Sequence, residues 1–378
     1  MKFSCTQENL LQGLSMVSHI TGKNINLPVL GNVLIKAEKT GIQLHTTNLE
    51  ISVSCSIRGK VDEDGEYSVP AKVFMDFVNL LPSGKVEFVL KEDGLEVVSS
   101  DQETVMRGMP ASEFPLLPKL QKNHTFTLKA ADVKRAVSRV VFSVSMSESR
   151  PELSGVACFF NSSGNEGKVA LVATDSYRLA EHLIGSGDSG KQTTILVPAR
   201  AMSEIQRIIS SYKDEIEPPE EVGWSVSDNQ LVVSYGAVEL TTRLIEATFP
   251  DYQNIIPSDF KTHVVLSRSE LQKAVKTASL FSRKEINDVH ITIDPETGIC
   301  SVESSDEGTG KTKSQLKGEV TGEANSVVLN FKYLTDGLNA FDTDKVKLAI
   351  IGAMSPMLIL PEKAEDADYR YLVMPIRQ

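Results

Sequence analysis

The pattern of apolar and polar positions predicts one element order, a strand followed by an amphipathic helix, at three places in the chain. Within residues 125–145, the β-prone run Phe126–Leu128 is followed by apolar side chains between Val133 and Val141 that recur every three or four residues. This spacing is typical of a helix with one buried face. Residues 2–17 and 263–278 repeat the same order. The pattern therefore predicts three copies of one unit.

Residues at the expected helix starts support this repeat. Thr6 and Ser267 stand where N-caps are expected for the first helix of copies one and three,. A second helix is predicted to open at Pro70 in copy one and at Pro198 in copy two, because the fixed φ of proline suits a first helical turn. Asn330 occupies this place in copy three. The spacing is 128 residues from Pro70 to Pro198 and 132 residues from Pro198 to Asn330, which indicates a duplicated domain rather than a short solenoid repeat.

The stretches between and after the helices predict antiparallel sheets. Apolar and polar residues alternate over residues 41–46, 49–55 and 85–90, as they do in half-buried strands. We therefore expect about eight strands and two helices in each copy. This is the α+β class, with the helices sharing one face of the sheets. The predicted domains are residues 1–122, 123–257 and 258–378.

Composition indicates an ordinary globular protein that stays in the cytoplasm. The hydrophobic share is 41% over 378 residues, and no apolar run approaches the length of a membrane span,. Polar residues interrupt the N-terminus where a signal peptide needs an apolar core. Four widely separated cysteines lack metal-ligand spacing and are expected to be buried thiols, namely Cys5, Cys55, Cys158 and Cys300,.

Charge is segregated between the repeated helices and the rest of the chain. The formal net charge is -11. The six repeated helices sum to +7, counted over residues 6–20, 70–80, 131–145, 197–213, 267–284 and 331–341, so the remaining residues carry -18. The total argues against a nonspecific polycation but conceals this segregation.

No catalytic, metal or cofactor site is predicted. Residues 305–312 differ by one residue from a phosphate-binding loop, but strand-like runs flank them where a helix is required, so they are expected to form a hairpin tip,. Histidines are scattered and no nucleophile elbow occurs. Two other functions stay open on the residues alone. An enzyme of nucleotide metabolism should bind ATP at residues 308–312, and a three-domain adhesion or scaffold protein should not be retained on DNA.

Two further stretches have two interpretations each. Residues 174–179 form a polar and aromatic cluster after an apolar strand, and this cluster is either a turn held by Asp175 or part of a binding site,. The last residues, 371–378, are apolar almost to the end, where chains usually fray. They are either a packed last strand or the rim of a binding site.

Six segments, in order along the chain, resemble one known family. They are Leu27–Val33, Thr47–Ile51, Arg150–Gly155, Ala173–Ala180, Phe249–Tyr252 and Val373–Arg377. Together they resemble the bacterial sliding clamp, the beta subunit of DNA polymerase III. The resemblance extends from one end of the chain to the other.

This resemblance implies the clamp fold, in which two head-to-tail subunits close a ring of six domains around duplex DNA. It implies a processivity factor without catalysis, whose partners are DNA, DNA polymerase III and other polymerases, the clamp loader and repair proteins. The residues expected to face DNA are Lys134, Arg135, Arg139, Arg200, Arg207, Lys273 and Lys276. The residues expected in the homodimer interface are Phe77, Leu81, Leu280 and Phe281.

The resemblance also implies a pocket for short apolar peptides between the second and third domains. Carried over to this sequence, its walls are Leu153, Thr174, Tyr177, Arg178, Leu179, Pro250, Ile255, Asn330, Tyr333, Met354, Val373, Met374, Pro375 and Ile376. Ser176-Tyr177 stands where the family commonly has Gly-His, and Gln378 stands where it commonly has Leu. These two departures predict a somewhat different peptide preference.

Overall fold

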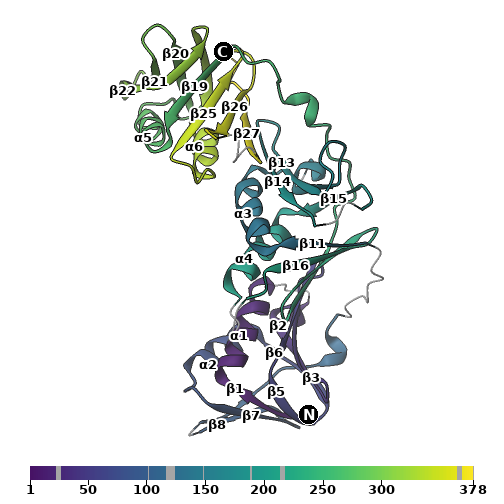
Figure 1. The fold of residues 1–378 in the computed structure, drawn as a ribbon. Helices are drawn as coiled ribbons and strands as arrows, with labels where there is room; N and C mark the ends of the chain where they lie inside the picture. The colour runs from purple at the N-terminus through teal and green to yellow at the C-terminus, as the bar shows by residue number, and fades with distance from the viewer. Residues whose placement is uncertain are drawn as a thin grey trace. The chain divides into compact units, whose positions relative to one another are not determined.

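In each copy, a strand leads directly into the first helix, as predicted. The computed structural model (Figure 1) describes residues 1–22, 27–100, 102–115, 124–147, 149–187, 190–212, 218–363 and 368–377. The three strand-to-helix pairs are β1 (Lys2–Thr6) with α1 (Gln7–Val17), β11 (His124–Lys129) with α3 (Ala130–Val140), and β19 (Thr262–Ser267) with α5 (Arg268–Ser279). The threefold repeat of this order is therefore confirmed.

Side chains cap several of these helices. The hydroxyl of Thr6 accepts from the N–H of Asn9 at 3.2 Å, and the hydroxyl of Ser267 accepts from the N–H of Glu270 at 3.5 Å,. The second helices are α2 (Ala71–Leu80), α4 (Ala199–Ser211) and α6 (Phe331–Asn339). Pro70 and Pro198 each end a strand immediately before the helix rather than opening it, because both still pair with a neighbouring strand.

The chain forms two compact units. Unit 1 consists of residues 1–134, 186–188 and 200–244, and unit 2 consists of residues 135–185, 189–199 and 245–378. The predicted boundary between residues 122 and 123 lies outside the described residues, and the predicted boundary between residues 257 and 258 falls inside unit 2. The division into three domains at these positions stays a prediction.

Unit 1 contains two antiparallel sheets. A five-stranded sheet has the order β5-β1-β7-β8-β9, and a nine-stranded sheet has the order β10-β6-β2-β3-β4-β18-β17-β16-β11. The strands are β2 (Asn32–Glu38), β3 (Gly41–Thr47), β4 (Ile51–Ile57), β5 (Gly59–Glu63), β6 (Gly65–Pro70), β7 (Lys85–Lys91), β8 (Gly94–Ser99), β9 (Gln102–Met106), β10 (Met109–Pro110), β16 (Glu221–Val226), β17 (Gln230–Tyr235) and β18 (Val238–Arg243).

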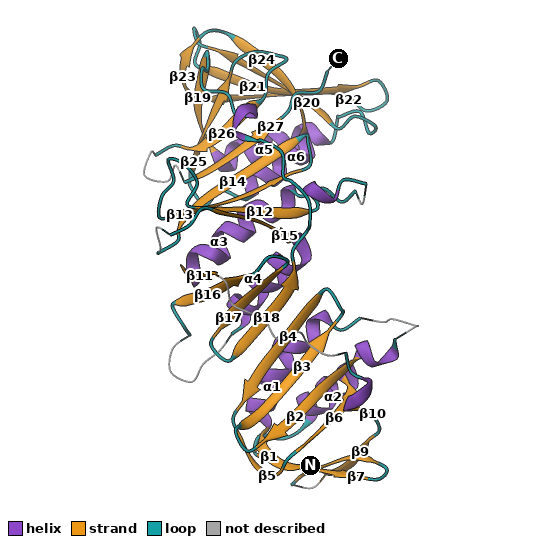
Figure 2. Cartoon of the chain, turned by 90° about the vertical axis from the view of Figure 1, so that its right-hand side faces the viewer, coloured by secondary structure: helices purple, strands orange, loops and turns teal. Residues whose placement is uncertain are grey.

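Helices α1 and α2 pack against each other and against the nine-stranded sheet, which lies in front of them in Figure 2. Leu10, Leu14, Met16 and Val17 are the large buried apolar side chains of α1. Gly13 allows the close approach to β4, because a Cβ atom there would lie 2.3 Å from Cγ2 of Ile57. The expectation that the helices share one face is confirmed for this sheet.

Unit 2 contains the other two sheets. A nine-stranded sheet has the order β15-β12-β13-β14-β27-β26-β25-β19-β23, and a four-stranded sheet has the order β22-β21-β20-β24. The strands are β12 (Gly155–Phe160), β13 (Lys168–Thr174), β14 (Arg178–Gly185), β15 (Thr193–Pro198), β20 (Asp288–Asp294), β21 (Ile299–Asp306), β22 (Gly310–Lys317), β23 (Glu319–Gly322), β24 (Asn325–Asn330), β25 (Lys345–Ile350), β26 (Met357–Pro361) and β27 (Tyr369–Val373).

Each nine-stranded sheet combines strands from two copies of the repeat. In unit 1, β4 of copy one pairs with β18 of copy two, and in unit 2, β14 of copy two pairs with β27 of copy three. The order of strands shows that β4, β14 and β22 occupy equivalent places, as do β9, β18 and β27. Two members of these sets, β22 and β9, each lie at the edge of a sheet.

Two smaller expectations, the hairpin tip and the buried cysteines, are also confirmed. Residues 305–312 form the tip of the β21–β22 hairpin, where the Asp306 carboxylate accepts from the backbone N–H groups of Gly308 and Thr309 at 3.0 Å. All four cysteines are buried free thiols, and burial raises the pKa of Cys5, Cys55 and Cys300 to about 12. None of the helices among the described residues has the length and apolar character needed to cross a membrane.

Candidate functional site

The nine-stranded sheet of unit 2 brings the residue 174–179 cluster and the C-terminal residues together at one end. Strands β13, β14, β27 and β26 are neighbours (Figure 2), and Arg178 at the start of β14 pairs with Val373 at the end of β27. The N–H of Met374 then donates to the carbonyl of Tyr177 at 2.8 Å. Both stretches that the sequence left open therefore belong to one location.

The turn between β13 and β14 is fixed by its own side chains. The hydroxyl of Thr174 donates to the carbonyl of Arg178 at 2.6 Å. One carboxylate oxygen of Asp175 accepts from the N–H groups of Tyr177 and Arg178 at 2.9 and 3.0 Å. Ser176 adopts a left-handed φ of 79°, which is uncommon for a residue with a side chain. The prediction that Asp175 holds a turn is confirmed.

The guanidinium of Arg178 connects this turn to two other elements. It donates from Nε to Asp175 at 2.9 Å, from Nη1 to Asp336 on α6 at 2.6 Å, and from Nη2 to the carbonyl of Phe142 at 2.8 Å. It also lies 4.7 Å from the centre of the Tyr333 ring, a distance at which a cation is attracted to the ring face. Only 11% of the Arg178 side chain is exposed, so its position is strongly determined.

An apolar cluster forms the base of this end of the sheet. It contains the buried side chains of Leu153, Leu179, Phe249, Tyr252 and Leu372, with Met374 packed against it. The segment Phe249–Tyr252, which the resemblance singled out, is thus part of the same cluster. Because these side chains are buried, the cluster fixes the position of this end of the sheet,.

A buried carboxylate that the sequence analysis did not find lies beside this cluster. Glu181 is 1% exposed, accepts from the hydroxyl of Tyr252 at 2.9 Å, and is paired with Arg370. Burial and the neighbouring Glu181 raise the pKa of Tyr252, so its hydroxyl remains protonated and continues to donate. The one sequence signal for this buried carboxylate was a single acidic residue within the apolar strand Leu179–Ile184.

The predicted pocket residues differ in exposure, and their role stays a prediction. Leu153, Thr174, Leu179 and Val373 are buried, whereas Tyr177, Ile255 and Met354 are exposed by 62%, 43% and 65%. The half-buried members are Arg178, Pro250, Asn330, Tyr333, Met374, Pro375 and Ile376. All fourteen belong to unit 2. Gln378 lies outside the described residues.

Unit 1 contains a second turn with the same backbone geometry. Thr47 donates its hydroxyl to the carbonyl of Ile51 at 3.1 Å, and the Asn48 side chain accepts from the N–H groups of Glu50 and Ile51 at 3.0 and 2.8 Å. Leu49 has a left-handed φ of 78°. In this turn Glu50 and Ile51 occupy the places of Tyr177 and Arg178, so neither the ring nor the guanidinium is repeated.

The seven cations predicted to face DNA fall into two groups. Lys134, Arg135, Arg200, Lys273 and Lys276 are exposed. Arg207, in contrast, donates to the carbonyls of Ser15 and Met16 at the end of α1, at 3.0 and 2.6 Å, and pairs with the buried Glu204 at 2.7 Å.

Arg139 is engaged in a similar way. Its side chain is 15% exposed, pairs with Asp342 at 2.6 Å, and lies 5.3 Å from the centre of the Tyr369 ring. Both arginines thus make contacts within their own unit that helical spacing could not reveal. The DNA-facing role of all seven residues stays a prediction.

The four predicted interface residues are also unequal. Leu280 is 70% exposed and Phe77 and Phe281 are half-buried, but Leu81 is only 5% exposed. Leu80, its neighbour, is 79% exposed, because the helix directs this position away from the core.

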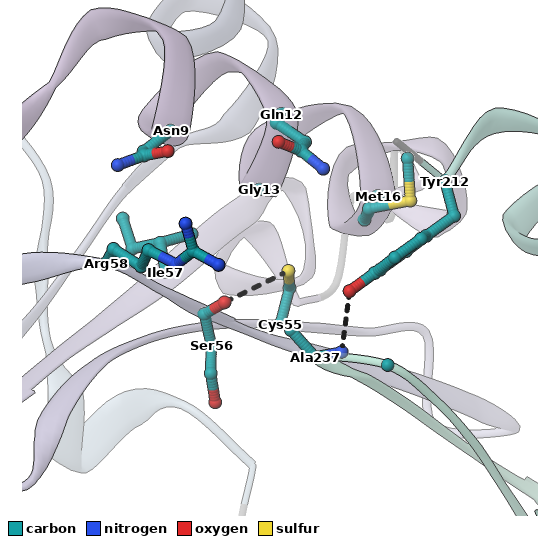
Figure 3. A pocket seen from close by; sticks show the side chains of 11 residues that line it. Asn9, Gln12, Gly13, Met16, Cys55, Ser56, Ile57, Arg58, Tyr212 and Ala237 are labelled. Carbon is teal, nitrogen blue, oxygen red and sulfur yellow. Dashed lines mark hydrogen bonds between the residues drawn. The ribbon is translucent and has the colours of Figure 1, made fainter. Parts of the chain in front are cut away.

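A separate pocket of about 400 Å³ lies in unit 1 (Figure 3) and contains none of the predicted site residues. Asn9 and Gln12 of α1 lie opposite Cys55 and Arg58, and the hydroxyl of Tyr212 accepts from the N–H of Ala237 at 3.0 Å. Because burial raises the pKa of Cys55 to about 12, its thiol is not a nucleophile near neutral pH,. Among the described residues, no group of three His, Cys, Asp or Glu side chains could hold a metal ion.

Comparison with known families covers nearly the whole chain. Three family models, which describe the N-terminal, central and C-terminal domains of the DNA polymerase III beta subunit, match residues 1–118, 127–251 and 253–377. A beta sliding clamp from Synechocystis is 28% identical, with 100% of this chain and 99% of the relative covered. A beta sliding clamp from Staphylococcus epidermidis is 26% identical with the same coverage.

Solved structures agree with this assignment. The DNA polymerase III beta subunit of Thermotoga maritima is 25% identical, with a TM-score of 0.90 over 100% of this chain and 99% of that one. A sliding clamp from Pseudomonas aeruginosa bound to griselimycin is 24% identical, with a TM-score of 0.91 over 100% of both chains. With family models, curated relatives and solved folds all spanning its length, the chain belongs to the DNA polymerase III beta subunit family, the bacterial sliding clamps.

Proposed function

We propose that this protein is a DNA polymerase processivity factor: two subunits close head to tail into a ring that encircles duplex DNA and slides along it. The observation that carries the proposal is the way strands join between copies of the repeat. Copy one joins copy two through β4 and β18, and copy two joins copy three through β14 and β27. The equivalent strands that remain, β22 and β9, each lie at a sheet edge.

Pairing β22 of one subunit with β9 of a second subunit continues this pattern. The four-stranded sheet that ends in β22 and the five-stranded sheet that ends in β9 together have nine strands, the same number as each joined sheet within the chain. Exposed edge strands are natural pairing sites, and two such head-to-tail joints in a dimer leave neither edge open.

Exposed apolar side chains lie on the elements beside these two edges. On the β22 side, Leu280 and Ile286 follow α5, which packs against β21 and β22, and are 70% and 37% exposed. On the β9 side, Val105 lies in β9 itself and is 42% exposed. Helix α2 contacts the same sheet through the rings of Phe74 and Phe88 of β7, and its Val73 and Leu80 are 61% and 79% exposed. Burying such side chains in a subunit interface is favourable.

In this proposal, the protein acts as a tether and carries out no chemistry. The exposed lysines and arginines of the repeated helices contact phosphates without reading sequence, so the ring is retained by topology and remains free to slide. The end of the unit 2 sheet, with its apolar base and its fixed Arg178, takes peptides of DNA polymerase III, other polymerases, the clamp loader and repair proteins. A protein with these partners is expected to act in the cytoplasm, where the DNA lies.

Retention on closed and opened DNA tests the proposal. After loading onto nicked circular DNA by a clamp loader, the protein should remain bound at a salt concentration that removes phosphate-only binders, and a restriction cut should release it. Equal retention before and after the cut contradicts topological binding. The same assay separates the alternatives, because a scaffold protein that does not bind DNA is never retained. An enzyme of nucleotide metabolism should instead bind ATP at residues 308–312, where Asp306 already occupies the backbone N–H groups.

A further inference from the structure

We propose that Glu103 and Lys313 select the partner subunit, because Glu103 of one subunit lies opposite Lys313 of the other in each joint of the dimer. The inference rests on the proposed function, since it assumes that β9 and β22 pair between subunits. It adds the register of that pairing and the charge pair that makes it specific for a second copy of this chain.

The position of Lys313 in β22 has an equivalent in each of the other two copies. In every copy, a row of paired residues runs across four strands and starts two residues before the strand end that precedes the second helix. The rows are Ser68, Leu34, His45 and Ser54 in copy one, Leu196, Ala157, Val172 and Glu181 in copy two, and Val328, His290, Glu303 and Lys313 in copy three. Ser54 of β4, Glu181 of β14 and Lys313 of β22 therefore occupy equivalent positions.

The position of Glu103 in β9 is fixed by a second set of rows. These start three residues before the end of the strand that leads into the first helix. The rows are Phe3, Phe88, Val97 and Thr104 in copy one, Phe126, Trp224, Val233 and Leu240 in copy two, and Val264, Leu348, Ile359 and Tyr371 in copy three. One residue before the end of each row stand Glu103 of β9, Glu239 of β18 and Arg370 of β27, which are therefore equivalent as well.

The two joints inside the chain pair these equivalent positions in the same way. The pairs are Ser54 with Glu239 in the first joint and Glu181 with Arg370 in the second. A slip of one residue turns every side chain of a strand to the other face of its sheet, so register is strongly specified where one face is buried. The register that both internal joints share places Lys313 opposite Glu103 in the joint between subunits.

The charges at this position distinguish the joints from one another. In the second joint, the acid Glu181 is on β14 and the base Arg370 is on β27. Between subunits the signs are exchanged, because the base Lys313 is on β22 and the acid Glu103 is on β9. If β9 paired in this register with a strand like β14, two carboxylates would lie opposite each other, and like charges in this position destabilise antiparallel strands. The exchanged signs therefore favour β22 as the partner of β9.

Both side chains are exposed at their sheet edges. Glu103 is exposed in β9, and the Lys313 side chain is 53% exposed in β22. Lys313 pairs with Glu303 of the neighbouring β21 at 2.8 Å, which holds its ammonium group over the face of the sheet that Glu103 shares in the proposed register. A second carboxylate across the joint extends this row of alternating charge, and salt weakens the added attraction because the groups face solvent.

Mixing two charge-reversed variants tests the selection. Glu103→Lys and Lys313→Glu each place like charges in both joints of a homodimer, so we expect the dimer dissociation constant to rise roughly fivefold to thirtyfold at low salt. In an equimolar mixture, both joints of the heterodimer combine opposite charges, so the dissociation constant should return close to that of the wild type. Fluorescence-detected sedimentation measures all three samples.

The control for this experiment is Asp228→Lys, at an exposed residue in the turn between β16 and β17. It changes the net charge by the same amount as Glu103→Lys but lies at neither sheet edge. It should leave the dissociation constant within about twofold of the wild type.

A disulfide tests the register independently of charge. Thr104 lies opposite Thr312 in the proposed register, as Leu240 lies opposite Val53 in the first joint. Directly opposite residues of antiparallel strands have Cα atoms about 4.5 to 5.5 Å apart, which suits a disulfide. A chain with both Thr104→Cys and Thr312→Cys should therefore form a covalent dimer under mild oxidation, visible on a non-reducing gel. Thr104→Cys with Ser314→Cys fits a register shifted by two residues and should not. The four native cysteines are buried and do not compete.

The outcomes separate the inference from the proposed function. Unchanged dissociation constants in both charge-reversed variants, or a mixture that fails to recover the dimer, overturn the selection by Glu103 and Lys313. Faster crosslinking through Ser314→Cys than through Thr312→Cys overturns the register. Each of these results is obtained with a dimeric wild type, so the ring itself stands. If the wild-type protein is a monomer at every accessible concentration, the ring of the proposed function fails, and the inference fails with it.

Discussion

The backbone N–H of Met374 donates to the backbone carbonyl of Tyr177 at 2.8 Å. This bond extends the β14–β27 ladder by one step beyond Val373. Two residues later, the N–H of Ile376 donates to the carbonyl of Val328 at 2.8 Å. The end of the chain is thus attached to the β13–β14 turn on one side and to β24 on the other.

Removing Met374 through Gln378 should abolish peptide binding and leave a dimer. The truncation keeps β27, which ends at Val373, and removes two backbone hydrogen bonds, so we expect a loss of about 1 to 3 kcal/mol in the free energy of unfolding,. Peptide affinity, dimer mass and thermal midpoint should be measured on the same sample. Unchanged peptide affinity in a folded truncated dimer would contradict the assignment of the pocket.

Acid should destabilise unit 2 through His182. Burial, followed by the neighbouring Arg139 and Arg135, lowers the pKa of His182 to about 3 from 6.5. Below pH 6.5 the unfolded chain binds a proton that the folded chain rejects, so stability is complete above this pH and falls as the pH decreases toward 3. At pH near 4.5 the loss should reach about 2 to 3 kcal/mol.

Substituting His182 by Gln isolates this contribution. The variant should show a shallower loss of stability between pH 6.5 and about 4.5 than the wild type in urea unfolding, since glutamine does not titrate. His45 in unit 1 serves as the matched comparison, because burial lowers its pKa to about 4. Identical pH profiles for the wild type and His182→Gln would show that the imidazole binds its proton equally well in the folded and unfolded chain, and would contradict the prediction.

Arg207 and Lys273 should behave differently although both were predicted to face DNA. Removing the Arg207 side chain leaves Glu204, which is 3% exposed, without its arginine, and frees the carbonyls of Ser15 and Met16. We expect Arg207→Ala to cost about 2 to 4 kcal/mol of stability. Lys273→Ala should leave stability within about 0.5 kcal/mol.

For DNA affinity we expect the opposite order, with a larger loss in Lys273→Ala than in Arg207→Ala. Lys273→Ala should weaken binding and reduce the slope of log affinity against log salt by about one unit or less. Both variants remove one positive charge, so the pair separates a phosphate contact from a structural one. If Arg207→Ala kept full stability and lost as much DNA affinity as Lys273→Ala, Arg207 would be a DNA-contacting residue and not a structural one.

Replacing Leu280 and Phe281 together by Ala should give monomers. Leu280 is 70% exposed and Phe281 half-buried at the end of α5, so the change removes interface area without emptying the core,. Met146→Ala is the control, because Met146 is 94% exposed but lies away from both sheet edges in the sequence. Light scattering at low concentration should report dimers for the control, and a double variant that stays dimeric there would remove Leu280 and Phe281 from the interface.

Local sequence patterns predicted the elements of this fold because helix caps and apolar spacing are local properties. The first helices, the N-caps at Thr6 and Ser267, and the hairpin at residues 305–312 follow from neighbouring residues alone. The joining of β4 to β18 and of β14 to β27 could not be predicted in the same way, since strand pairing depends on residues far apart in the chain,.

The site was predictable to a similar degree. The turn at Asp175 follows from its sequence, but the partners of Arg178 on α6 and at Phe142 are distant in the chain. The sequence predicted the same DNA-facing role for Arg207 and Lys273. A charge pattern does not distinguish a solvated cation from one that reaches a neighbouring helix. Glu181 was missed for the same reason, as its partners Tyr252 and Arg370 come from other segments.

The paired turns at residues 47–51 and 174–178 show that the backbone support of the site does not depend on the side chains that it carries. Threonine hydroxyls, an Asn or Asp side chain and one left-handed residue build the same frame twice. The side chains that this support carries share no residue type: they are Leu49-Glu50-Ile51 in one turn and Ser176-Tyr177-Arg178 in the other. The same backbone support thus carries different side chains at its two places, so the side chains at residues 176 and 177 should be exchangeable while the backbone of the turn keeps its conformation.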